Sequence, residues 1–142
     1  MPATVVYDAP GEVTVRFDED AAEILATWTR FGDERVFKDN LDVQADLVES
    51  GRAKFVIVDT EHTTGVPSAK DQDYLMRFVF PRYREGGLEA ILTVVPQSAR
   101  TKMGAKRWIH SGNVWRFAMY EVASVEDARA VIAEKHARSS VS

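Results

Sequence analysis

The 142-residue sequence contains no cysteine, which excludes disulfide bonds, thiolate metal sites and thiol catalysis. It has no long hydrophobic run, since stretches such as 55–58 are far shorter than the ~20 residues that span a bilayer. Basic residues are not in excess, because 22 acidic and 18 basic residues give a net charge of −4. We therefore expect no membrane insertion and no nucleic-acid partner.

The beginning of the sequence also lacks a targeting signal. Residues 1–8 contain no basic segment followed by a long apolar run, so a cytoplasmic location is expected. What is present is ordinary for a globular domain: 45% hydrophobic and 28% charged residues. A chain of this length forms one domain without a metal or disulfide, and we expect it to span 1–142 with a core over about 5–135.

The first half of the sequence shows both strand and helix periodicities. Apolar residues alternate with polar ones over 5–7 and 13–17, with a Pro-Gly pair between them, which predicts an antiparallel hairpin. The spacing of apolar residues over 20–31 fits one face of a helix, preceded by a run of acids. A second helix is predicted over 33–50, ended by Gly51.

The second half alternates between predicted strands and helices. Apolar runs predict strands over 54–59 and 90–95, with a further strand from Trp115 to Val122. Helices are predicted from Ser68 to Gly86, with a bend or early end at Pro81, then from Ser98 to His110, and finally from Ser124. The order ββααβαβαβα predicts an α/β fold in which crossover helices join parallel strands.

This order resembles the anti-sigma-factor antagonist (STAS) domain and small STAS-like proteins. The residues that carry the resemblance are the strand Phe55–Asp59, which ends in an acid, and the stretch Gly65–Gln72 at the start of a Ser-capped helix. The strand beginning Trp115-Arg116-Phe117 and the later Ser124–Ala128 resemble the family's ending. The resemblance covers about residues 5–135 and implies a single-domain STAS-like fold.

The resemblance also implies a function. Regulatory STAS proteins are non-catalytic modules that bind a protein partner, and a kinase phosphorylates a serine at the start of this helix. Ser68 lies nine residues after Asp59, about where that serine falls, although Pro67 replaces the family's Asp and Ala69-Lys70 its Ser-Gly pair. The resemblance therefore implies a phosphosite at Ser68 and partner binding through residues 60–68 and the helix that follows.

Candidate binding residues gather where the predicted strands end, because ligands of α/β sheets bind at the carboxyl ends of strands. Two helices also begin there, and their free backbone N–H groups suit an anion. The basic residues Arg100, Lys102, Lys106 and Arg107 either grip an anionic group or form a solvated helix face. The candidate ligand- or partner-binding residues are Asp59, His62, Thr63, Ser68, Ser98 and Arg100.

Two of these residues have more than one interpretation. His62 is either an exposed loop residue or a general base or metal ligand beside Asp59 and Glu61, although no second histidine stands at ligand spacing. Ser68 is a helix N-cap, a phosphosite or a nucleophile, and no Gly-x-Ser-x-Gly sequence supports the last. We predict no catalytic residue, no metal site and no cofactor.

Three hypotheses for function follow. The first is a non-catalytic STAS-like regulatory module with an unidentified protein partner. The second is a protein that binds a small anionic or apolar metabolite, because the predicted helices over 20–31 and 33–50 could roof an apolar pocket. The third is an enzyme that uses His62. A homodimer is a further possibility, since residues 1–73 carry a charge of −9 and residues 74–142 a charge of +5.

Overall fold

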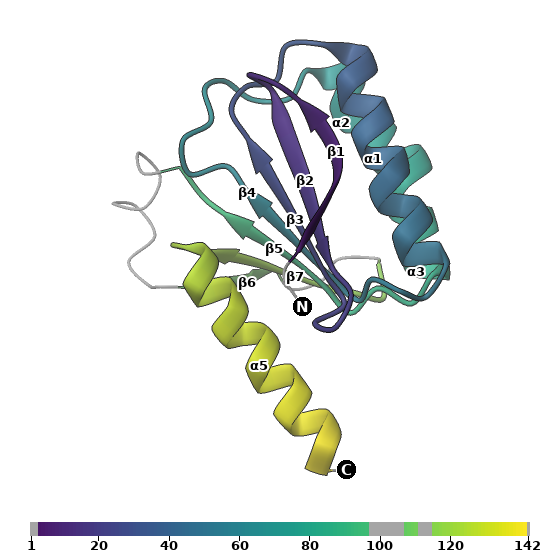
Figure 1. Ribbon diagram of the computed structural model, residues 1–142, viewed down its shortest axis with the longest axis vertical. Coiled ribbons are helices and arrows are strands. Elements are labelled where there is room, and N and C mark those ends of the chain that lie inside the picture. The colour runs from purple at the N-terminus through teal and green to yellow at the C-terminus, as the bar shows by residue number, and fades with distance from the viewer. Residues whose placement is uncertain (1–2, 97–106, 111–114, 142) are drawn as a thin grey trace.

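The fold comes from a computed structural model that describes residues 3–96, 107–110 and 115–141. Within these ranges seven strands form one mixed sheet, in the order β1-β2-β3-β4-β5-β7-β6 (Figure 1). Strands β1 to β3 are antiparallel, β3, β4, β5 and β7 are parallel, and β6 is antiparallel to β7. The bounds are β1 Thr4–Ala9, β2 Val13–Asp18, β3 Glu23–Trp28, β4 Phe55–Asp59, β5 Ala90–Val94, β6 Arg107–His110 and β7 Ala118–Val122.

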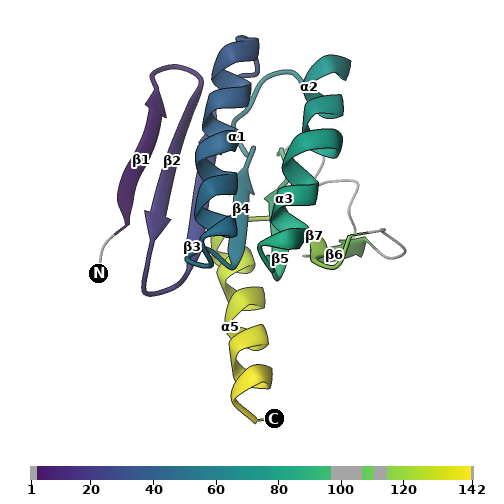
Figure 2. The same ribbon diagram turned by 90° about the vertical axis from the view of Figure 1, so that its right-hand side faces the viewer.

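Helices cover both faces of this sheet (Figures 1 and 2). One face carries α1 together with a continuous helical segment made of α2, the π-helical turn η1 and α3. The other face carries α5, which packs on β4, β5 and β7. Each interface holds its own cluster of buried apolar residues. The bounds are α1 Glu34–Glu49, α2 Ala69–Tyr74, η1 Leu75–Val79, α3 Phe80–Glu85 and α5 Val125–Val141.

The predicted helix over 20–31 is wrong, because this segment forms the internal strand β3. Ile24, Ala26 and Trp28 are buried on one side of the strand, in the two-residue period of a β-strand. Leu25 packs on the opposite side, against the α5 cluster. A strand covered on both faces is apolar on both, so adjacent apolar residues imitated the spacing of a helix.

The acidic run that was expected to start this helix instead forms the turn between β2 and β3. The Asp18 carboxylate accepts a hydrogen bond from the backbone N–H of Ala21, at 3.1 Å. Ala22 then adopts a φ of +53°, which turns the chain into β3. The hairpin expected before this turn is confirmed as β1 and β2.

Most elements of the second half lie where the sequence predicts them. The strands expected over 54–59 and 90–95 are β4 and β5, and the helix expected over 33–50 is α1. The strand expected from Trp115 starts later, at Ala118. In the helix expected from Ser98 to His110, residues 107–110 instead pair with β7 as β6, and the earlier part lies outside the described residues.

The order ββααβαβαβα is therefore corrected. Along the described residues it is β1-β2-β3-α1-β4-α2-η1-α3-β5-β6-β7-α5. The helix does not end at Pro81 but continues to Glu85. Pro81 stands in the first turn of α3, directly after the π-helical turn, where its missing N–H costs least. Gly86 then caps the helix as expected, and Gly87 leaves it with a φ of +79°.

Candidate ligand-binding site

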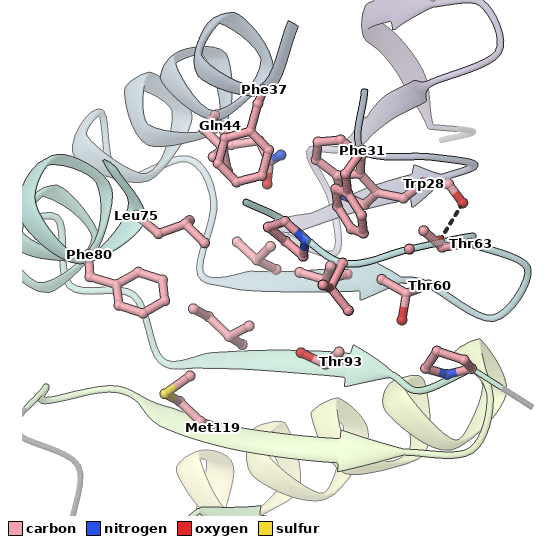
Figure 3. A pocket seen from close by; sticks show the side chains of 18 of the residues that line it. Trp28, Phe31, Phe37, Gln44, Thr60, Thr63, Leu75, Phe80, Thr93 and Met119 are labelled. Atoms are coloured by element: carbon pink, nitrogen blue, oxygen red, sulfur yellow. Dashed lines mark hydrogen bonds between the residues drawn. The ribbon is translucent and has the colours of Figure 1, made fainter. Parts of the chain in front are cut away.

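A pocket of about 320 Å³ lies between the sheet and the helical layer of α1 and α2–α3 (Figure 3). Its floor comes from the central strands and its roof from the two helical segments. One end is covered by residues 60–67, the loop that follows β4. Among the described residues no charged side chain lines this space, and its polar groups belong to Gln44, Tyr83, three threonines and the indole of Trp28.

The side chains of the floor show that the space is unfilled. Val58 and Thr93 lie on the central strands β4 and β5, yet both are only half-buried. Their chain neighbours Ile57 and Leu92 point to the other face of the sheet and are completely buried beneath α5. Since strands cover both edges of β4 and β5, the exposed area of Val58 and Thr93 faces the pocket.

Three aromatic rings form one wall of the pocket. Trp28 ends β3, Phe31 follows in the connection to α1, and Phe37 lies in the first turns of α1. The ring centroids of Trp28 lie 4.6 Å from Phe31 and 5.6 Å from Phe37, in tilted arrangements. Such packed rings present a rigid apolar surface, because each side chain has only two rotatable bonds.

The loop over 60–67 is held across the ends of three strands. Thr60 donates its hydroxyl to the Val94 carbonyl at 2.6 Å, at the end of β5. Thr63 donates its hydroxyl to the Trp28 carbonyl at 2.8 Å, at the end of β3 (Figure 3). The Thr64 N–H also bonds the Thr29 carbonyl at 3.1 Å. These bonds fix the loop above the end of β4, so it forms a defined wall of the pocket.

The roof contains a chain of buried polar side chains. Asn40 donates to the Val36 and Phe37 carbonyls of α1, each at 2.8 Å, and accepts from the Gln44 amide at 2.9 Å. Gln44 in turn accepts a long hydrogen bond of 3.5 Å from the Tyr83 hydroxyl. Burial strongly raises the pKa of Tyr83, so this hydroxyl stays protonated. The amide of Gln44 is therefore engaged at both of its ends.

The two roof helices are joined by charged contacts on their outer side. Arg82 of α3 bonds Asp46 of α1 at 2.5 Å and Glu49 through its Nε at 2.6 Å. The Tyr74 hydroxyl donates to Asp42 at 2.5 Å. Burial, with this hydrogen bond, raises the pKa of Tyr74 to about 12. These contacts fix α1 against the second helical segment above the pocket.

Of the predicted site residues that the structure describes, Thr63 lines the pocket, whereas Asp59, His62 and Ser68 do not. Asp59 ends β4, and its carboxylate accepts the Glu61 N–H at 3.0 Å within the loop. His62 is exposed on the loop and does not line the pocket. Ser68 is exposed and accepts the Asp71 N–H at 3.1 Å, which confirms it as the N-cap of α2.

The remaining predicted residues belong to the segment after β5. Ser98 and Arg100 lie outside the described residues, as do Lys102 and Lys106 of the basic run. The second helix N-terminus of the predicted anion site lies there too. The described part of the chain places Asp59 at the end of β4, Thr63 against the end of β3 and Ser68 at the start of α2.

Sequence reasoning missed most of the pocket lining. Trp28 and Phe37 are buried in the core cluster. They also line the pocket, because the core on this face is incompletely filled. Close packing is a property of the whole assembly, so no local sequence signal separates a core aromatic from a pocket aromatic.

The described residues show neither a metal site nor a membrane-spanning helix. Across the described residues, no group of three histidine, aspartate or glutamate side chains is placed to hold a metal ion. In the same part of the chain no helix has the length and apolar character to cross a membrane. Comparisons with family models, curated proteins and solved structures found no match. The STAS-like resemblance therefore stays a prediction.

Proposed function

We propose that this protein binds a small, neutral, largely apolar molecule in the pocket between the sheet and the helices. The observation that carries the proposal is the lining: aromatic and aliphatic side chains with no charged group among the described residues. Burying an ion without a partner costs several kcal/mol, whereas burying apolar surface is favourable. Between the anionic and apolar metabolites considered from sequence, the lining favours an apolar one.

The volume sets the size of the molecule. An apolar cavity of about 150 Å³ holds benzene, which has six carbon atoms. By proportion, the pocket of about 320 Å³ has room for about 13 non-hydrogen atoms. It lies at the lower end of the range of natural small-molecule sites. Molecules of one or two rings, or a short branched chain, fit this volume.

A binding role is favoured over catalysis. His62 and Asp59, which the enzyme hypothesis required, do not line the pocket. The titratable side chain that does, Tyr83, is held protonated by burial. The described lining therefore offers a molecule shape and apolar contact rather than a general base.

The test is an NMR titration of the ¹⁵N-labelled protein with 2-methylnaphthalene, which has eleven non-hydrogen atoms. We expect saturable shifts of the amides of β4, β5 and α1 around the pocket. The anion 2-naphthoate, of similar shape, is expected to bind at least tenfold more weakly. Equal binding of both molecules, or shifts remote from the pocket, would contradict the proposal.

A matched pair of variants locates the site. Val58→Phe places a phenyl ring in the pocket and is expected to weaken 2-methylnaphthalene binding at least tenfold. Val5→Phe makes the same change on the edge strand β1, where Val5 is half exposed and away from the pocket. The control is expected to bind as the wild type does. Equal affinity of both variants would place the binding elsewhere.

The interaction-module hypothesis also has an observation in its favour. Val66 is 78% exposed on the loop, and Phe78 is 57% exposed on the adjoining helical segment. These apolar side chains lie within the region that the sequence predicts for partner binding. We propose this surface as a second candidate, with Ser68 beside it as the possible phosphosite. Identical partner binding by Ser68→Asp and Ser68→Ala would exclude a phosphorylation switch there.

A further inference from the structure

The polar side chains of the pocket differ in whether their hydrogen bonds are already made. Thr60 and Thr63 donate their hydroxyls to backbone carbonyls. Gln44 donates to Asn40 and accepts from Tyr83. The Thr93 hydroxyl makes no hydrogen bond with any residue in the described ranges. Among the hydroxyl and amide groups of the described lining, it is thus the one without a hydrogen-bond partner.

The residues that neighbour Thr93 on the β4 side are apolar, whereas its paired residue on β7 is Glu121. Thr93 lies in a cross-strand row that runs through Val15 of β2, Ala26 of β3 and Val58 of β4. Figure 3 shows the Thr93 side chain on the pocket side of β5. A valine would have the same shape and would leave no polar group unpaired. Packing and strand formation therefore do not require the hydroxyl.

We infer that the bound molecule carries one neutral hydrogen-bonding group, a hydroxyl or a carbonyl, that pairs with the hydroxyl of Thr93. A threonine hydroxyl both donates and accepts, so either group completes the pair. The absence of charged side chains from the described lining favours a neutral group over a carboxylate or ammonium, because burying an ion without a partner costs several kcal/mol. The expected ligand is an apolar body with a single alcohol, phenol or ketone. This inference rests on the proposed function.

Two probes of equal size separate this inference from the proposed function. 2-Methylnaphthalene and 2-naphthol each have eleven non-hydrogen atoms, are neutral at pH 7, and differ by a methyl group against a hydroxyl. The quantity to measure is the ratio of their affinities by NMR titration. In Thr93→Val, the preference for 2-naphthol relative to 2-methylnaphthalene is expected to fall about tenfold, as for a hydrogen bond lost in an apolar site.

Thr27→Val is the matched control. Thr27 lies on β3 between the pocket-facing residues Ala26 and Trp28, so its side chain points to the opposite face of the sheet. This variant is expected to keep the wild-type ratio. A ratio within twofold of wild type in Thr93→Val overturns the inference, including the case in which both probes weaken equally. If 2-methylnaphthalene still binds, the proposed function stands; if neither probe binds the wild type in the pocket, both fail.

Discussion

The cross-strand row of Val15, Ala26 and Val58 offers a test of whether the pocket is unfilled space. Val15 and Val58 face the same helical layer, and both can be changed to phenylalanine. Val15 is completely buried among packed neighbours and does not line the pocket. Val58 lines the pocket and is only half-buried. The same substitution therefore meets a full core at one position and open space at the other.

The expected effects differ in sign. Adding a larger side chain to a close-packed core typically costs about 1–3 kcal/mol, which we expect for Val15→Phe. Val58→Phe instead moves the added ring carbons from water into the pocket. A buried phenylalanine exceeds a buried valine by roughly 1 kcal/mol of transfer free energy. The variants should therefore differ by about 2–4 kcal/mol in the free energy of unfolding.

Chemical denaturation of the two variants and the wild type measures this difference. In thermal unfolding, each kcal/mol should shift the Tm of a chain of this length by about 3–5 °C. We expect Val15→Phe to lower the Tm clearly and Val58→Phe to leave it unchanged or raise it. If Val58→Phe is as destabilised as Val15→Phe, the pocket is not open space and the reasoning is refuted.

Three contacts outside the pocket give independent checks. Ser68→Ala removes the N-cap acceptor and should cost about 1 kcal/mol in urea unfolding, whereas Ser68→Asp retains it; equal losses would refute the cap. Gly86→Ala would place a Cβ 2.6 Å from the Val48 carbonyl oxygen and should therefore lower the Tm. A Tm equal to wild type would disprove this close approach of α3 to α1. The raised pKa of Tyr74, about 12 against an ordinary 10, means that its bond to Asp42 stabilises the fold below pH 10 and is lost towards pH 12. Between pH 10 and pH 12, the free energy of unfolding of the wild type should approach that of Tyr74→Phe. A constant difference between the two proteins would contradict the stabilising role of this hydrogen bond.

The elements that the sequence predicts well have local signals. Asp33 caps α1 through the N–H groups of Arg35 and Val36, and Gly51 ends it with a φ of +81°. Ser124 accepts the Asp127 N–H at 3.0 Å at the start of α5, as its position predicts. Capping and positive φ depend on a few neighbouring residues, so they can be recognised before the fold is known.

The wrong helix predictions fall on segments whose secondary structure is set by pairing with strands distant in the sequence. Residues 23–28 form a strand because β2 and β4 pair with both of its edges, and neither pairing is visible in the segment itself. Residues 107–110 are too few for periodicity to separate a strand from a helix, and pairing with β7 decides between them. β-structure depends on partners distant in sequence more than helices do.

The sequence predicts the edge of the candidate site but not its floor and roof. Ligands of α/β sheets bind where parallel strands end, which predicts a site at residues 59–68. Thr63 of this segment does line the pocket. The floor and roof lie deeper, between β4, β5 and α1, where an apolar residue has the same appearance in sequence whether it is packed or lines a space. Only the half-buried state of Val58 and Thr93 distinguishes them.

The central claim is that a small apolar molecule occupies this pocket, and intermolecular NOEs test it most directly. The protein is labelled at its methyl groups and saturated with 2-methylnaphthalene. We predict NOEs from the probe to Val58 of β4, Leu75 of η1 and Met119 of β7 together, since these three line the pocket from different elements. NOEs confined to exposed methyl groups such as those of Val5, or no NOEs at saturation, would contradict the account.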